Sequence, residues 1–238
     1  MKIFRSHKIL YLSTLIVFSL LVNNCSLMAK DIHQNKLNKK NMIEKMKKAK
    51  IVFLITKDPD NYEADKTVPL FAEMLRKKYG YDVTVLLGSG EHGSYRYPNM
   101  EIVSKADLLI IFARRIALPH EQMDIIKNYL SKGKPLIGIR TANHAFKVMG
   151  KIEEGFEDWP DFVADILGCE NRGYGPVGPG MEISVVPEEV THPILKNVAR
   201  GWHVDGNVYL VAPLLDMTAT VLLNGKTNNI TEPVAWTR

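Results

Sequence analysis

Short apolar runs alternate with amphipathic segments from residue 51 to residue 140, and this alternation predicts an α/β fold. Four runs are predominantly apolar, as expected for strands that are covered on both faces of a parallel sheet. They are residues 51–55, 81–87, 107–112 and 135–140. Apolar residues at helical spacing predict a helix over 68–79 that Gly80 ends, and a helix over 119–130 that opens at Pro119. Together these elements predict a doubly wound, mostly parallel sheet.

The second half of the chain is less regular. Residues 161–167 predict a short helix, and the Gly- and Pro-rich residues 169–180 predict a loop. Residues 181–186 and 219–223 predict strands, which we expect as antiparallel additions. Because no internal repeat is evident, we expect one domain over residues 51–238.

The first 29 residues have the pattern of an export signal. Lys2, Arg5 and Lys8 precede an apolar stretch over 9–22, which is short for a membrane-spanning helix, and Leu27-Met28-Ala29 offers a cleavage point. The pattern predicts a periplasmic or extracellular protein with no membrane span in its mature form. Two alternatives remain open: an uncleaved membrane anchor, and a lipoprotein tethered through a lipid on Cys25.

Positive charge is concentrated before residue 51. The formal charge of the whole chain is +5, and the first 50 residues contribute +9, so residues 51–238 carry −4. Residues 30–50, rich in Lys and Asn, predict a solvated tether. A mildly acidic folded part argues against nucleic-acid binding. Since Cys25 lies in the signal, Cys169 is alone in the mature chain, and we expect it to be a buried, small apolar residue.

Polar residues follow each predicted parallel strand. Ligands of doubly wound sheets bind at the carboxyl ends of the strands, so these residues are the first candidates for a site. They are Thr56, Lys57 and Asp58 after the first strand, residues 89–92 after the second, Arg114 and Arg115 after the third, and Arg140, Thr141, Asn143 and His144 after the fourth. Of the two neighbouring arginines, we expect Arg114 to be a surface charge.

The segment Gly138–Phe146 (GIRTANHAF) is the most informative of these. We expect it to end a buried parallel strand in a sharp strand-to-helix turn, with small residues around a central one, as a nucleophile turn requires. The central residue is Arg140, with no Cys or Ser nearby, which argues against acyl transfer by a nucleophile. A phosphate loop and a dinucleotide-binding glycine pattern are also absent from the expected positions, so NAD binding is disfavoured.

Five segments carry a resemblance to a known family. DLLIIFARRIALPHEQM, GKPLIGIRTANHAF, THPILKNV, APLLDMTATVLL and EPVAWT, in this order, resemble the ThuA-like (trehalose-utilisation) family over residues 51–238. The resemblance implies a flavodoxin-like fold of the class I glutamine amidotransferase type without its catalytic cysteine, and a role in carbohydrate metabolism. It transfers no firm catalytic assignment.

The chain departs from the family pattern in two places. Residues 168–175 contain no histidine where family members usually carry one. The sequence also ends at Arg238, before a Gly-Arg-Val-Phe-Tyr strand that the family pattern continues into. We therefore expect a domain truncated at its C-terminus, with an exposed edge or an uncovered apolar face.

These observations give two hypotheses for the function. The first is an exported enzyme, a carbohydrate-active hydrolase, lyase or isomerase but not a glutamine amidotransferase, which acts on a sugar or keto-sugar by acid–base chemistry. Arginine would polarise a carbonyl or hydroxyl group and histidine would move a proton. The second is a non-catalytic sugar-binding or interaction module on the same fold.

The candidate residues follow from their places at strand ends and from the resemblance. The catalytic candidates are His144, Arg140 and Arg115, and the substrate-binding candidates are Asn143, Thr141, His203, Asp205 and His92. No cofactor is predicted; a zinc-like ion would take His144, His192 and His203, although their spacing is long. Structural alternatives also stand: His144 caps the turn, His192 serves a turn, and Arg140 pairs with Glu121 or Glu170.

Overall fold

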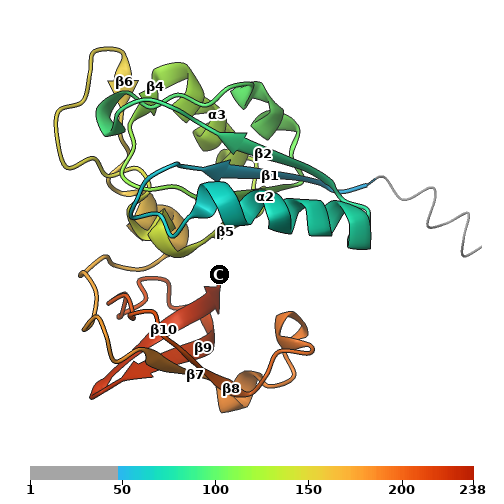
Figure 1. Ribbon diagram of the computed structural model, residues 1–238, viewed down its shortest axis with the longest axis vertical. Coiled ribbons are helices and arrows are strands. Elements are labelled where there is room, and N and C mark those ends of the chain that lie inside the picture. Colours follow the sequence, from blue (N-terminus) through green and yellow to red (C-terminus); the bar gives the residue numbers. More distant parts are fainter. Residues whose placement is uncertain (1–47) are drawn as a thin grey trace, which may run out of the picture. The chain divides into compact units, whose positions relative to one another are not determined.

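The computed structural model describes residues 48–238 (Figure 1). The export signal predicted for residues 1–29 and nearly all of the tether predicted for residues 30–50 lie outside the described residues. The last tether residue, Lys50, is already the first residue of a strand. No helix within residues 48–238 is long and apolar enough to cross a membrane.

A four-stranded parallel sheet of order β2-β1-β3-β5 is the centre of the fold. Its strands are β1 (Lys50–Ile55), β2 (Asp82–Leu87), β3 (Leu108–Phe112) and β5 (Leu136–Gly138). Alternate side chains of β1 and β3 enter two different cores: Val52 and Leu54 pack on one face, Phe53 and Ile55 on the other. Continuous apolar runs are therefore explained by burial on both faces.

Two helices cover these two faces. The core that contains Phe53 includes buried residues of α2 (Ala64–Met74), and the core that contains Leu54 includes buried residues of α3 (His120–Ser131). Figure 1 shows α2 and α3 on opposite sides of β1 and β2. This arrangement confirms the predicted α/β fold with a doubly wound parallel sheet.

Helix α2 starts four residues before the predicted position. The chain turns through two left-handed residues, Tyr62 and Glu63, and the helix begins directly after them. It continues as one π-helical turn, η1 (Leu75–Tyr79), and ends at Gly80, whose φ of 72° favours glycine. Leu70 and Phe71 are exposed, which explains why apolar spacing alone misplaced the start.

Short elements complete the N-terminal and middle parts. β4 (Leu118–Pro119) pairs with β6 (Phe156–Glu157), and η4 (Arg140–His144) follows β5. The remaining short helices are η2 (His92–Ser94), η3 (Met100–Lys105), η5 (Val163–Leu167), η6 (Pro187–Glu189) and η7 (Pro193–Leu195).

The antiparallel strands predicted for the C-terminal half are present and form a sheet of their own. Its order is β10-β9-β7-β8. The strands are β7 (Met181–Val185), β8 (Gly201–Val204), β9 (Thr220–Thr227) and β10 (Ile230–Thr237). Within the described residues β10 pairs with β9 alone, so it is an edge strand. Trp236 of β10 donates its indole N–H to the carbonyl oxygen of Leu167 at 2.8 Å, which links this sheet to η5.

One expectation about the parallel sheet is wrong. The strand that precedes Arg140 is not buried: β5 is an edge strand that pairs with β3, and its residue Ile137 is 47% exposed. Apolar composition indicated burial, but no strand of residues 48–238 covers the outer edge of β5. The following residues Thr141, Ala142 and Asn143 are buried, so burial begins after the strand.

Candidate functional site

A buried asparagine joins the carboxyl ends of three parallel strands. The Asn61 Nδ2 group donates to the carbonyl oxygens of Thr56 and Phe112, at 3.0 and 2.9 Å, which follow or end β1 and β3. The hydroxyl of Thr141, in the short helix η4 that follows β5, donates to Asn61 Oδ1 at 2.5 Å. No pattern in the sequence pointed to Asn61. Thr141, a predicted ligand-binding residue, is buried and holds the strand ends together.

The turn after β5 has the strained geometry expected of a nucleophile elbow. Arg140 has a φ of 49°, in the left-handed region that non-glycine residues rarely occupy. A Cβ atom on Gly138 would lie 3.1 Å from the Cβ of Ala142 and 2.9 Å from Leu167, so the turn is tightly packed. Arg115, after β3, is also left-handed, with a φ of 52°. Such conformations cost about 1–3 kcal/mol each and persist where the surroundings impose them.

The Arg140 side chain is clamped between two tyrosines. Its guanidinium carbon lies 4.6 Å from the ring centroids of both Tyr62 and Tyr209. Two of its nitrogens donate to the backbone and side-chain oxygens of Asn207, each at 2.8 Å. The Tyr62 and Tyr209 hydroxyls are 3.3 Å apart. Arg140 thus braces the segment around Asn207 against the strand ends.

The expected alternative, an ion pair of Arg140 with Glu121 or Glu170, is not formed. The Glu121 carboxylate lies 3.7 Å from Arg96, and the Glu170 carboxylate lies 3.9 Å from Arg172. Among the described residues Arg140 therefore has no acidic partner.

His144 is a partly buried imidazole beside two cations. Burial, and then the charges of Arg115 and Arg114, lower its pKa to about 4, against a smaller opposing effect of Asp58. The ring is therefore neutral at pH 7. It lies 5.9 Å from the ring of Tyr209, whose pKa burial raises, so that phenol stays protonated.

Arg115 is a partly buried cation whose charge acts on His144. Burial and the charge of Arg114 lower its pKa, and no carboxylate of the described residues forms an ion pair with it. Its backbone N–H donates to the carbonyl oxygen of His144 at 3.1 Å. The main chains of Arg115 and His144, the residues after β3 and β5, thus lie side by side in the fold.

A second histidine is held by a buried carboxylate. The His92 Nε2 atom lies 2.7 Å from Asp58 Oδ2, and Asp58 also accepts from Arg114 Nη1 at 3.2 Å. Arg114 reaches Asp60 as well, at 2.9 Å, and its side chain is only 20% exposed. The expectation that Arg114 is a surface charge is wrong, because the Asp-Pro-Asp turn after β1 partly buries and pairs it.

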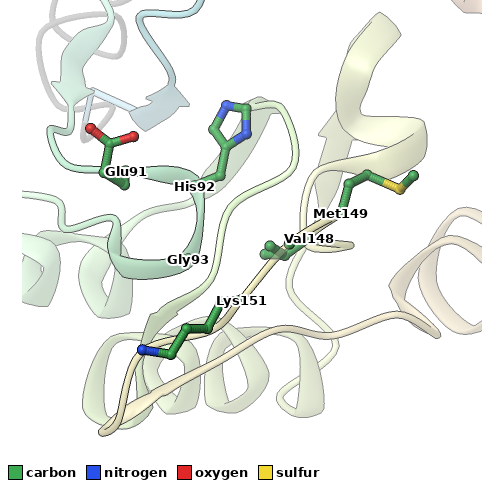
Figure 2. A pocket seen from close by; sticks show the side chains of 7 residues that line it. Glu91, His92, Gly93, Val148, Met149 and Lys151 are labelled. Carbon is green, nitrogen blue, oxygen red and sulfur yellow. The ribbon is translucent and has the colours of Figure 1, made fainter.

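A shallow pocket of about 400 Å³ opens beside His92. Figure 2 shows its lining from two segments, residues 91–93 and residues 148–151. Gly93 is required between them, because a Cβ atom there would lie 2.0 Å from the carbonyl oxygen of Lys151. The volume lies within the range of small-molecule sites. The pocket includes His92, but none of the catalytic candidates predicted from the sequence lines it.

Asn143, a predicted substrate-binding residue next to His144, is buried. The Asn143 Nδ2 group has no hydrogen-bond partner among the described residues, and its Oδ1 lies 3.8 Å from the Cys169 Sγ atom. Cys169 is buried as expected, and burial raises its pKa to about 12. The thiol is therefore not a nucleophile at neutral pH.

The remaining histidines have separate partners. His203 Nδ1 lies 2.6 Å from Glu182 in the antiparallel sheet, and its Nε2 lies 3.6 Å from Asp205, both exposed. His192 accepts the N–H of Ile194 at 3.3 Å and so caps a short helix. Within residues 48–238, no group of three or more His, Cys, Asp or Glu side chains is arranged to hold a metal ion.

Comparison with known proteins gives a fold assignment. No protein-family model matches the chain, and no curated protein matches it. A solved structure described as a ThuA-like protein from Bacteroides uniformis is similar with a TM-score of 0.57 at 16% identity, over 79% of this chain and 76% of that one. Another, described as ThuA-like from Parabacteroides merdae, has a TM-score of 0.50 at 13% identity, over 76% and 70%. At these identities the likeness shows the fold, and it confirms at that level the resemblance found in the sequence.

Proposed function

We propose that this chain is an exported enzyme that acts on a sugar or keto-sugar by acid–base chemistry at the carboxyl ends of the parallel strands. The observation that carries this proposal is the neutral imidazole of His144 beside Arg115, a guanidinium without an acidic partner among the described residues. A neutral imidazole accepts a proton, and an unpaired guanidinium stabilises negative charge on oxygen.

The two groups would divide the chemistry between them. Arg115 would polarise a carbonyl or hydroxyl oxygen of the ligand, while His144 takes a proton from the adjacent atom. Arg140 would act as a positioning residue, because its guanidinium is already committed to Asn207 and to the two tyrosine rings. The sequence resemblance to ThuA-like proteins supports a carbohydrate as the substrate class, and the two similar solved structures are described as ThuA-like.

Turnover on a panel of mono- and disaccharides and their keto forms tests this proposal. His144→Gln should lose turnover by about 10²–10⁴-fold, the usual contribution of a general base. His120→Gln is the matched control, since His120 is an exposed histidine of α3, 3.7 Å from Glu157. Turnover in the His144 variant equal to that in the control would remove His144 from the mechanism.

A specific observation favours the alternative of a sugar-binding module. A pKa of about 4 makes His144 a weak base at neutral pH, and Arg140 is used to hold the structure. Calorimetry decides between the two functions. Heat of binding for a sugar without any product would favour the module, whereas product formation by the unmodified chain would rule it out.

Export is a separate part of the proposal and rests on the sequence of residues 1–29. Cell fractionation of the full chain should place it outside the cytoplasm. If lipid is attached at Cys25, Cys25→Ser will release the protein from the membrane fraction. Recovery of the unprocessed chain in the cytoplasm would contradict export.

A further inference from the structure

His92 has the surroundings of a proton-transfer group, although the function proposed above does not use it. Its side chain is 47% exposed, whereas the Asp58 carboxylate that holds it is 7% exposed. Asp58 is fixed in turn by Arg114 and by the backbone N–H of Asp60 at 2.8 Å. The ring therefore has one nitrogen anchored to an acceptor of low exposure, while the side chain as a whole is accessible and belongs to the lining of the pocket.

The anchor determines which nitrogen is free. Burial acts to raise the pKa of Asp58, but the hydrogen bonds from Asp60 and His92 and the charge of Arg114 together lower it below its usual value, so this carboxylate is ionised. An ionised carboxylate only accepts hydrogen bonds, so His92 Nε2 must carry the hydrogen. In the neutral ring, Nδ1 then has the unshared electron pair and is the basic nitrogen.

One short backbone segment binds the main chains of both His92 and His144. The N–H of Arg115 donates to the carbonyl oxygen of His144 at 3.1 Å, and the N–H of Ala117 donates to that of His92 at 2.7 Å. Two residues of one short segment thus fix both histidines. Residues 148–151, which follow η4 and His144 by only a few residues, form part of the lining of the pocket beside His92 (Figure 2).

We propose that His92 is a second proton-transfer residue, which acts on a keto-sugar bound in the pocket of residues 91–93 and 148–151. The proposal rests on the function proposed above and adds a catalytic residue to it. His92 Nδ1 takes the proton from a carbon next to the ketone. The C–H electron pair becomes the C=C bond of an enolate, and the carbonyl π pair moves onto oxygen. Return of a proton to carbon restores the ketone, so no other reactant is needed. Asp58 is a positioning residue, because it keeps the hydrogen of the His92 ring on Nε2.

Exchange of carbon-bound hydrogen with solvent tests the step without knowledge of the product. The full chain is incubated in D₂O with D-fructose, D-tagatose or L-sorbose, and the loss of the signal next to the carbonyl is followed by ¹H NMR. His92→Gln should slow exchange by about 10²–10⁴-fold. Asp58→Asn should lower kcat by about 10²-fold with little change in KM, because the ring loses its orientation. His120→Gln is the control.

Chemical rescue separates proton transfer from a structural role. Added imidazole should restore exchange in His92→Gly in proportion to its concentration, and should not restore it in the Asp58 variant. Thermal melting of each variant shows whether it is folded, and a folded His92→Gln with wild-type exchange overturns the proposal.

The two proposals fail in different ways. Exchange that depends on His144 but not on His92 leaves the proposed function standing and removes this inference. Absence of exchange by the unmodified chain on all three ketoses counts against both. Loss in His92→Gly without rescue by imidazole, in a folded protein, also refutes proton transfer by His92.

Discussion

Because folding lowers the pKa of His144, the free energy of unfolding should fall as the pH drops, and the substitution His144→Gln should remove this contribution. In the folded chain the pKa is lowered from 6.5 to about 4. Between these values the unfolded chain binds a proton that the folded chain does not, so stability is complete above pH 6.5 and falls as the pH drops towards 4. From pH 8 to pH 5, a single group with these two pKa values loses about 2 kcal/mol of unfolding free energy. Partial exposure of the ring makes this an upper value.

Urea unfolding at pH 8 and at pH 5 measures this loss. His144→Gln keeps a polar side chain but cannot be protonated, so its loss between the two pH values should be smaller than that of the unmodified chain by about 1–2 kcal/mol. Arg115→Met is the second arm. Because Arg115 helps to lower the pKa of His144, this variant should shrink the same pH dependence without abolishing it. If the unmodified chain and His144→Gln lose the same unfolding free energy between pH 8 and pH 5, the pKa of His144 is not lowered by folding.

Three further changes test the packing of the site, each by urea unfolding at pH 8. Arg140→Met removes both hydrogen bonds to Asn207 and should cost about 2 kcal/mol; an unchanged midpoint would show that the brace carries no stability. Thr141→Val leaves the buried Oδ1 of Asn61 without its hydroxyl donor and should cost about 1–3 kcal/mol, whereas Thr141→Ser should cost less. Gly93→Ala forces apart two tightly packed loops and should cost about 1–3 kcal/mol; wild-type stability would mean that the facing loop moves freely.

The parallel sheet could be predicted because its signal is local. Each strand is a run of apolar residues, and the alternation of side chains between the cores of α2 and α3 requires every position of such a run to be apolar. Edge position is not a local property. Residues 135–140 look as buried as residues 51–55, yet β5 has only β3 beside it and exposes Ile137. The pattern gave no indication of which strand lies at the edge.

The sequence predicted which strand ends carry the site, but not which side chains bind one another there. The rule that ligands bind at the carboxyl ends of strands selected Arg115 and His144, which the fold places together. The pairs that define the site join residues far apart in the chain: His92 with Asp58 at a separation of 34 residues, and Thr141 with Asn61 at 80. The spacing of apolar and polar residues along the chain does not indicate such long-range pairs. His203 was grouped with the site by resemblance, whereas its hydrogen-bond partner Glu182 lies in the antiparallel sheet.

The segment from Arg115 to Ala117 determines how far apart the backbones of His92 and His144 lie. Its terminal N–H groups bind the carbonyl oxygens of His144 and His92, and two residues of backbone span at most about 7 Å. The distance between the main chains of His92 and His144 is therefore set by backbone hydrogen bonds, which do not depend on the side chains. Substitution of the side chain at either histidine position would leave these main-chain hydrogen bonds in place. Insertion or deletion of one residue in the segment would alter that distance and the reach of both side chains together.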